Sequence, residues 1–271
     1  MSGPPVLGAL VEFRQLDLFA AQSSGVHRLD ARAKVVVVLA FVVCVMSFGR
    51  YAVASLLPYF AFPVLVAIWA QLPFAMLARK VAMVVPIAVL IGLPNPFFDR
   101  EMVLHVAGLG ISGGWISLVS IVLRALLAAA AAIVLVAVTG FPAVCGALER
   151  LGMPKALAVQ LLFLYRYLTV LGEEALRMTT ARELRGGGRK LSIRLYGVLV
   201  GRLLMRTWDR AERIYLAMCA RGFVGDFNSG PVSRFGWRDL AFVGGCCGAF
   251  LLFRVRDVVQ VVGNAALGGG R

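Results

Sequence analysis

The stretch Arg177-Met-Thr-Thr-Ala-Arg-Glu-Leu-Arg-Gly-Gly-Gly188 forms the C-terminal end of a predicted amphipathic helix. A second stretch, Glu212-Arg-Ile-Tyr-Leu-Ala-Met-Cys-Ala-Arg-Gly-Phe223, repeats this ending, in which an arginine directly precedes a glycine. Glycine commonly follows a helix C-terminus, and the helix dipole favours arginine in the last turn. Favourable interaction with the helix dipole would explain the position of each arginine separately. Two long helices with the same cationic end, in an otherwise apolar chain, favour a docking surface.

The composition around these two stretches is that of a membrane protein. The 271 residues are 60% hydrophobic and only 15% charged, and the mean hydropathy is +0.85. A chain with this composition is too apolar to be a soluble domain with an ordinary surface, so we expect the lipid bilayer to be the solvent of this chain. The formal net charge of +14 could also suit nucleic acid, but the arginines lie between apolar runs and not on a free basic domain. We therefore expect no nucleic-acid partner.

Apolar runs predict an all-α integral membrane protein with about five transmembrane helices and two long cytoplasmic amphipathic coupling helices. The predicted spans are Val35–Phe48, Ala52–Leu72, Val81–Leu93, Trp115–Val138 and Asp239–Phe253. This gives four regions along the chain: a leader at 1–34, a transmembrane bundle at 35–139, a coupling region at 140–235, and a last span with its tail at 236–271.

The basic residues predict the orientation in the membrane. Over half of all Lys and Arg lie between residues 140 and 235, and a basic cluster, His27-Arg-Leu-Asp-Ala-Arg-Ala-Lys34, precedes the first span. By the positive-inside rule, the N-terminus and the coupling helices are cytoplasmic and the chain is a multi-pass protein of the inner (plasma) membrane. We expect no cleavable signal peptide, because the first apolar run follows Lys34.

Each coupling helix carries an apolar stripe with steps of three and four residues, which predicts packing along another helix. On the first helix, which follows Pro154 and ends at Gly186, the stripe contains Leu161, Leu164, Leu168, Leu171 and Met178. On the second, from about Ser192 to Arg221, it contains Leu204, Trp208, Tyr215 and Met218. Continuing the first stripe by the same steps reaches Arg182 and Arg185. The predicted seam therefore changes from apolar to cationic as that helix ends.

Few other residues suggest chemistry. His27 lacks partner ligands in the sequence, and Asp99, Glu101 and His105 lie in a predicted loop, so a metal site is the weaker reading of each. Arg124 lies within a predicted span, where a charge is a functional candidate, although snorkelling or pairing with another subunit explains it equally well. The five cysteines have no metal-ligand spacing and mostly lie in apolar runs.

We find no catalytic constellation in the sequence. It has no Walker A loop, no Gly-x-Ser-x-Gly and no His-Glu-x-x-His. The spans hold almost no acidic residues, which a proton-coupled carrier would be expected to bury. We predict a non-catalytic subunit of a larger machine, with no catalytic residue, no metal site and no cofactor of its own.

The two arginine–glycine endings make the chain similar to the transmembrane (T) component of energy-coupling-factor (ECF) ABC-type transporters, over nearly its whole length. The second motif is Ala217-Met-Cys-Ala-Arg-Gly-Phe223, and the first is Ala181-Arg-Glu-Leu-Arg-Gly186. His27–Lys34 and Asn95-Pro-Phe-Phe98 resemble the cobalt/nickel branch, although Ala31 stands where that branch usually has proline.

The resemblance implies that two ABC-type ATPase subunits bind ATP and that a separate membrane (S) subunit binds the substrate, cobalt or nickel. The implied ATPase-coupling residues are Arg182, Arg185, Gly186, Ala220, Arg221 and Gly222. Either Arg182 or Arg185 can align with the first motif. The helices would transmit ATP-driven motion to the S subunit.

Other functions remain open at this stage. Within the same family, the S subunit could bind nickel or a vitamin in place of cobalt. From a different class, the chain could be a self-sufficient membrane carrier or channel. A membrane-embedded enzyme is the least supported reading, because no nucleophile, base or metal site can be assembled.

Overall fold

The computed structural model describes residues 19–20, 25–98, 102–106, 109–186, 192–223 and 236–255. The chain divides into two compact units. We name Phe19–Gly140 with Ser233–Arg271 the bundle unit, and Met1–Leu18 with Phe141–Val232 the arm unit. Each unit is described separately below.

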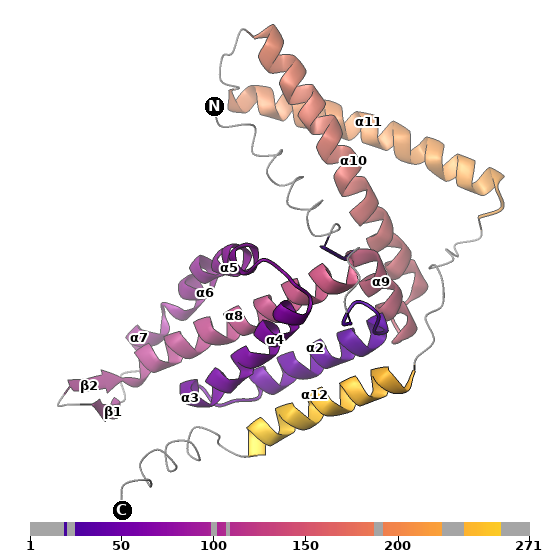
Figure 1. Ribbon diagram of the computed structural model, residues 1–271. Helices are drawn as coiled ribbons and strands as arrows, with labels where there is room; N and C mark the ends of the chain where they lie inside the picture. Colours follow the sequence, from indigo (N-terminus) through magenta and orange to yellow (C-terminus); the bar gives the residue numbers. More distant parts are fainter. Residues whose placement is uncertain are drawn as a thin grey trace, which may run out of the picture. The chain divides into compact units, whose positions relative to one another are not determined.

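The bundle unit is built around one long helix, α8 (Gly113–Thr139), which contacts most of the other helices of the unit (Figure 1). Its other helices are α2 (Ala31–Met46), α3 (Val53–Leu56), the 3₁₀ turn η1 (Leu57–Phe60), α4 (Ala61–Trp69), α5 (Phe74–Ala82), α6 (Val85–Gly92), α7 (Asn95–Phe98) and α12 (Trp237–Val255). The strands β1 (Met102–Val106) and β2 (Leu109–Ser112) pair antiparallel before α8. The Ala-rich sequence of α8 allows its neighbours to approach closely.

An aromatic cluster forms the core where α2, η1 and α12 meet. Phe41, Tyr59 and Phe250 are buried, and the rings of Phe41 and Phe250 pack edge to face with centroids 5.4 Å apart. The Tyr59 hydroxyl donates a hydrogen bond of 2.9 Å to the backbone carbonyl of Phe250. This bond satisfies a polar group that would be costly to bury unpaired in an apolar interior.

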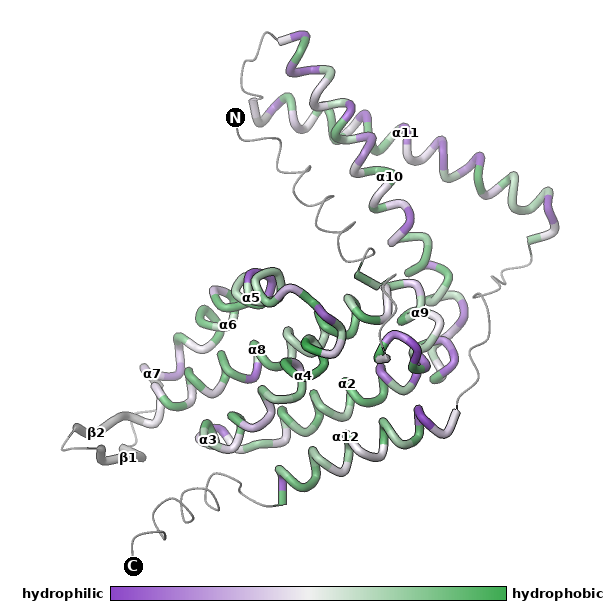
Figure 2. The backbone as a smooth tube through the Cα atoms, in the orientation of Figure 1, coloured by the Kyte–Doolittle hydropathy of each residue, from purple (hydrophilic) through white to green (hydrophobic). Residues whose placement is uncertain are grey.

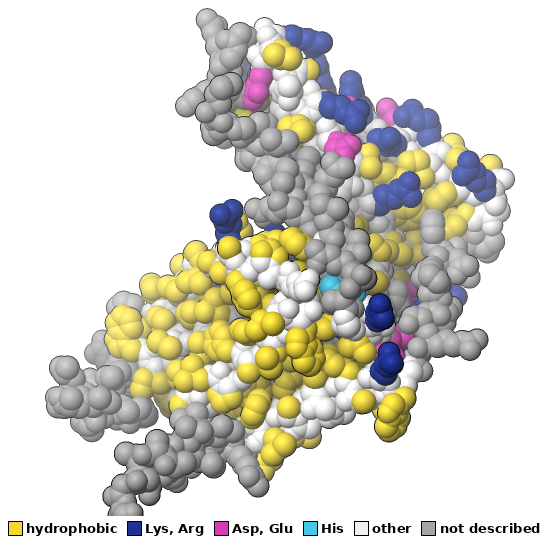
Figure 3. Space-filling view, in the orientation of Figure 1, with side chains coloured by type: hydrophobic (Ala, Val, Ile, Leu, Met, Phe, Trp, Pro, Cys, Tyr) yellow, Lys and Arg dark blue, Asp and Glu magenta, His cyan; other side chains and the backbone are white. Residues whose placement is uncertain are grey.

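The surface of the bundle unit is apolar, as a lipid-facing surface requires. Exposed side chains on this unit include Val43, Trp69, Leu90 and Ile91, and hydrophobic side chains cover its visible face (Figure 3). Among the described residues, three helical segments are long and apolar enough to cross a membrane. Phe74–Gly92 and Gly113–Thr139 belong to the bundle unit, and Lys155–Arg185 belongs to the arm unit, where the sequence predicted a cytoplasmic helix. The prediction of an all-α integral membrane protein is confirmed.

The predicted span boundaries need two corrections. The third span does not begin after Lys80, because Arg79 and Lys80 lie in the last turn of α5, where the helix dipole favours them. The helical segment therefore starts at Phe74. The link before α8 is also no plain loop, because Met102–Val106 and Leu109–Ser112 pair as antiparallel strands. Asp99 and Glu101 lie outside the described residues.

The arm unit consists of α9 (Phe141–Arg150), α10 (Lys155–Arg185) and α11 (Ile193–Ala220), with α11 crossing α10 (Figure 1). Gly152 has φ of 114° and follows α9, so this glycine ends the helix in a left-handed conformation that other residues rarely adopt. Hydrophilic residues recur along α11 between apolar ones (Figure 2). The ends of α10 and α11 lie within two residues of the predicted positions.

Candidate coupling surface

The α10 end places its two arginines on the same surface. Arg182 and Arg185 occupy the last turn and are exposed, and Gly186 caps the helix with φ of −88°. The Gly186 amide donates to the carbonyl of Arg182 at 2.9 Å. Because both arginines line the same pocket between α10 and α11, either one can serve as the arginine of the first motif.

The α11 end differs in backbone geometry from the α10 end. Arg221 is the C-cap residue and Gly222 follows it with φ of 79°. The amide of Phe223 donates to the carbonyl of Met218, and that of Gly222 to the carbonyl of Cys219, both at 3.0 Å. This pair of bonds is a Schellman motif, which requires the left-handed glycine. Ala220, Arg221 and Gly222 are all exposed at the helix tip.

The two arginine ends lie far apart on the arm unit. Leu195, near the start of α11, lines the same pocket as Arg185. Since α11 is continuous from Ile193 to Ala220, a rise of 1.5 Å per residue places Arg221 about 39 Å from Leu195. One side chain of a partner cannot reach both ends, so the arm unit offers two separate cationic tips.

An ion pair ties the two helices together at their crossing. The Nη1 atom of Arg206 on α11 lies 2.6 Å from Oε1 of Glu174 on α10. The Arg206 side chain remains largely exposed while that of Glu174 is mostly covered. Such a partly exposed pair contributes modestly to stability, about 0.2–1 kcal/mol, so we assign it chiefly to fixing the register of the crossing.

Within the described chain, four of the nine predicted seam residues are partly buried and five are exposed, and their packing along another helix stays a prediction. Leu164 and Leu168 on α10 are 61% and 43% exposed, while Leu204, Trp208 and Tyr215 on α11 are 64%, 72% and 60% exposed. Leu161, Leu171, Met178 and Met218 are partly buried. The helices cross instead of lying side by side. On α11 the more buried face lies one residue before the predicted stripe. It contains Leu195, Leu199, Leu203, Thr207 and Ile214.

Beyond the crossing, the diverging helices leave an apolar groove of about 410 Å³. Phe163, Tyr167 and Leu171 line it from α10, and Leu204 and Trp208 are among the residues that line it from α11. The exposed seam residues Leu204 and Trp208 therefore border an open apolar surface that no described part of the chain covers.

Tyr215 and Cys219 lie one turn apart on α11, just before the second tip. A hydrogen bond between the side chains of Tyr215 and Cys219, the largest effect, raises the pKa of Tyr215 above its ordinary value. The tyrosine stays protonated at neutral pH, so the charge at this end of α11 comes from Arg221.

Known proteins are similar in sequence to this chain in both units. The model of the cobalt transport protein family CbiQ matches residues 22–231. This chain belongs to the CbiQ family. The cobalt transport protein CbiQ of Rhodobacter capsulatus is 30% identical over 191 residues, which covers 68% of this chain and 78% of that protein.

Two further relatives match shorter segments. The nickel permease LarQ of Lactiplantibacillus plantarum is 34% identical over 102 residues, or 37% of each chain. The uncharacterized protein MJ1089 of Methanocaldococcus jannaschii is 33% identical over 79 residues, or 28% of this chain and 30% of that protein. This chain thus spans less than half of either protein in the alignment. The family predicted from the two arginine motifs is confirmed by these matches.

The CbiQ match includes the basic cluster before α2, whose carboxylates organise the start of that helix. Asp30 is the N-cap residue, and its side chain accepts a hydrogen bond of 2.8 Å from the Arg32 amide. Asp239 on α12 accepts from the amides of Asp30 and Gly236, each at 2.8 Å. Asp239 lies beyond the matched residues and sequence reasoning did not single it out, although an acid in the first turn of a helix was a usable signal.

Lys34 is buried beside these two carboxylates. Burial lowers its pKa to about 8, although the charges of Asp30 and Asp239 act in the opposite direction. Its Nζ lies 3.4 Å from the carbonyl of His27, and the ring of His27 contacts the carbonyl of Phe19 at 3.1 Å. These residues therefore form a polar junction between α2 and α12.

Arg124, a functional candidate in the sequence, is a structural residue of the bundle unit. Its guanidinium donates to the carbonyl of Gly49, just past the end of α2. Arg254 of α12 donates to the Ser47 carbonyl at 3.1 Å and lies 4.3 Å from the Phe48 ring centroid. Two arginines thus neutralise the negative end of one helix dipole.

Asn95, in the second stretch that resembles the cobalt/nickel branch, attaches α7 to α8. Its side-chain amide donates a hydrogen bond of 3.0 Å to the hydroxyl of Ser117. The remaining metal candidate, His105, is in β1, and its side chain is outside the described part. No group of three potential metal ligands occurs among the described residues.

Proposed function

We propose that this chain is the transmembrane coupling subunit, or T component, of an ECF-type importer of cobalt. The observation that carries the proposal is the pair of exposed arginine–glycine tips at the two ends of the arm unit. Membership of the CbiQ family supports a role in cobalt transport. Here the ATPase activity and the substrate site belong to partner subunits.

Each tip would dock into a groove on one of two ABC-type ATPases. A guanidinium keeps its charge and forms planar, multidentate bonds with carboxylates and backbone carbonyls. The separation of the tips by about 39 Å supports two docking partners over one. The positive charge of the arm unit supports a cytoplasmic location for both tips, on the side where the ATPases would bind ATP.

Movement of the ATPases would reach the S subunit through the crossed helices. The Glu174–Arg206 pair supports a fixed crossing, so that a shift of one tip turns the other helix. The apolar groove bordered by Leu204 and Trp208 supports a contact with the membrane-embedded S subunit. Apolar surface of this extent is typical of a protein interface.

Nickel is the second candidate substrate, favoured by the similarity to the nickel permease LarQ. In either case the proposal places the transported ion on the S subunit. A vitamin substrate would be the remaining choice within this class of importer. Uptake of radiolabelled cobalt, nickel and a vitamin mixture by cells that express the complete complex would separate the three.

Co-purification tests the coupling role. The tagged chain is purified in mild detergent from its native membranes as wild type, as Arg185→Glu/Arg221→Glu, and as the control Arg166→Glu/Arg210→Glu. The control reverses two exposed arginines on the same helices away from the tips. We expect nucleotide-binding subunits with the wild type and the control, and their loss from the tip variant.

Two results would contradict the proposal. One is ATPases that stay bound to the tip variant, with unchanged ATP-dependent uptake. The other is wild-type protein that arrives alone in several detergents with ATP present and that transports substrate in vesicles without ATPases. The second result would establish a self-sufficient carrier.

A further inference from the structure

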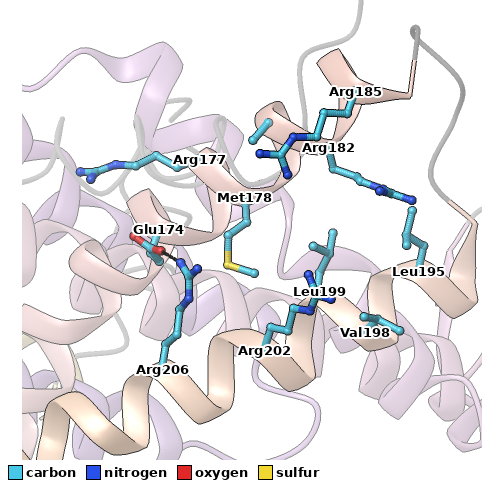
Figure 4. Close-up of a pocket in the computed structure, with 11 residues that line it drawn as sticks. Glu174, Arg177, Met178, Arg182, Arg185, Leu195, Val198, Leu199, Arg202 and Arg206 are labelled. Atoms are coloured by element: carbon cyan, nitrogen blue, oxygen red, sulfur yellow. Dashed lines mark hydrogen bonds and ion pairs between the residues drawn. The ribbon is translucent and has the colours of Figure 1, made fainter.

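Arginines dominate a pocket of about 350 Å³ between α10 and α11 of the arm unit (Figure 4). The arginines that line it are Arg177, Arg182, Arg185, Arg202 and Arg206. Met178 of α10 extends toward α11 and Arg206 of α11 extends toward Glu174 of α10, whereas Arg177 extends away from α11. The pocket is therefore cationic on both of its walls.

The negative charge within the pocket is too small to balance these arginines. Glu174 is the one carboxylate among the lining residues, and Arg206 already binds it at 2.6 Å. Arg177 pairs with Glu173 at 3.6 Å. No carboxylate in the described part of the chain pairs with Arg182, Arg185 or Arg202. Like charges held this closely repel one another, so an anion between them would be stabilised.

We propose that this pocket binds a phosphate-bearing anion. A phosphate group offers several oxygens arranged tetrahedrally, so guanidinium groups from both helices can bind it at once. A single carboxylate is satisfied by one bidentate arginine and would leave the others unpaired. The inference goes beyond the coupling role, although Arg182 and Arg185 belong to both surfaces, and it is tested on this chain alone, without ATPases.

The other lining residues indicate which phosphate compound fits best. Met178, Leu195, Val198 and Leu199 give the pocket an apolar wall beside the arginines. The glycerol and the first acyl carbons of a phospholipid would contact that wall while its phosphate binds the arginines. Anionic lipids are attracted to basic segments at the cytoplasmic leaflet. A free phosphate compound would use the arginines only.

Binding to the purified full-length chain tests the proposal. The probes are dioctanoyl phosphatidylglycerol, dioctanoyl phosphatidylcholine and sodium pyrophosphate, titrated calorimetrically in a non-ionic detergent. The pocket variant is Arg182→Gln/Arg202→Gln, which removes one arginine from each helix. The matched control is Arg166→Gln/Arg210→Gln, which removes one exposed arginine from each helix outside the pocket.

We expect phosphatidylglycerol to bind the wild type and the control alike, and the pocket variant at least about tenfold more weakly, since charge-assisted bonds are lost. Weak binding of pyrophosphate and phosphatidylcholine would identify an anionic lipid headgroup as the source of the phosphate. Pyrophosphate binding with the same dependence on the variants would identify a free phosphate compound.

Two outcomes overturn the proposal: neither anion binds the wild type, or the pocket variant and the control lose affinity equally. If the pocket variant does not fold, Arg182→Lys/Arg202→Lys keeps the charge while removing the guanidinium fork. We then expect an intermediate loss of affinity, and an affinity equal to wild type would exclude guanidinium recognition.

Discussion

Asp239 of α12 accepts a hydrogen bond of 2.8 Å from the backbone amide of Asp30, the residue that caps α2. The second oxygen of the same carboxylate accepts from the Gly236 amide at 2.8 Å. One side chain therefore joins the starts of the first and last helices of the bundle unit, which lie far apart in the sequence.

Replacing Asp239 should destabilise the bundle unit. Asp239→Ala leaves the buried Asp30 amide and the part-buried Gly236 amide without their acceptor, so we expect a loss of about 1–3 kcal/mol in the free energy of unfolding. Asp239→Asn should lose less, because one oxygen remains. Thermal unfolding in detergent measures both, with the exposed neighbour Arg238→Ala as control. Equal melting temperatures for Asp239→Ala and Arg238→Ala would contradict the assigned role.

Ala31 stands where the cobalt/nickel branch usually has proline, and the structure explains why either residue fits. Ala31 is the first helical residue of α2, a position at which the missing proline N–H is not needed. Asp30 before it has φ of −59° and ψ of 136°, the extended conformation that a following proline requires. We expect Ala31→Pro to stabilise the chain by roughly 0.4–1 kcal/mol. A lowered melting temperature would refute this.

Arg124 should matter for folding and not for transport chemistry. Arg124→Ala removes a guanidinium that binds the Gly49 carbonyl at the end of α2. We expect about 1–3 kcal/mol of destabilisation and less protein in the membrane, with substrate uptake per assembled complex unchanged. Quantifying uptake against the amount of purified complex distinguishes this from a direct transport role, in which the normalised uptake would fall as well.

The glycines of the two tips should respond differently to substitution. Gly222 has φ of 79° whereas Gly186 has φ of −88°, so of the two only Gly222 has a backbone conformation that disfavours alanine. At Gly186 a Cβ would lie 3.2 Å from the Arg182 carbonyl oxygen, a tight contact that a small shift relieves. We expect Gly222→Ala to cost about 1–2 kcal/mol and Gly186→Ala less. Hydrogen exchange of the Gly222 and Phe223 amides reports the difference, since the Schellman bonds open in the first variant. Equal exchange in both variants would contradict it.

The sequence predicted where the long helices begin and end, but not which residues contact one another in the fold. Hydropathy and helix-end residues predicted α8, α10 and α11, since these signals depend on nearby residues. The exposed seam residues have no predicted neighbour, because spacing of three and four identifies an apolar face but not the element that covers it. The sequence left the role of Arg124 open because the Gly49 carbonyl that binds it lies 75 residues earlier in the chain. Asp239 was missed for the same reason.

The exposed seam should serve a partner and not the stability of this chain. Trp208 is 72% exposed and borders the apolar groove. Trp208→Ser should therefore change the free energy of unfolding by no more than about 0.5 kcal/mol. The same variant should weaken retention of the S subunit during co-purification while the ATPases, which would bind the arginine tips, remain.

Leu199→Ala is the matched control, because Leu199 lies on the more buried face of α11. It should lower stability without a selective loss of the S subunit. Unchanged retention in Trp208→Ser would place the S subunit on another surface.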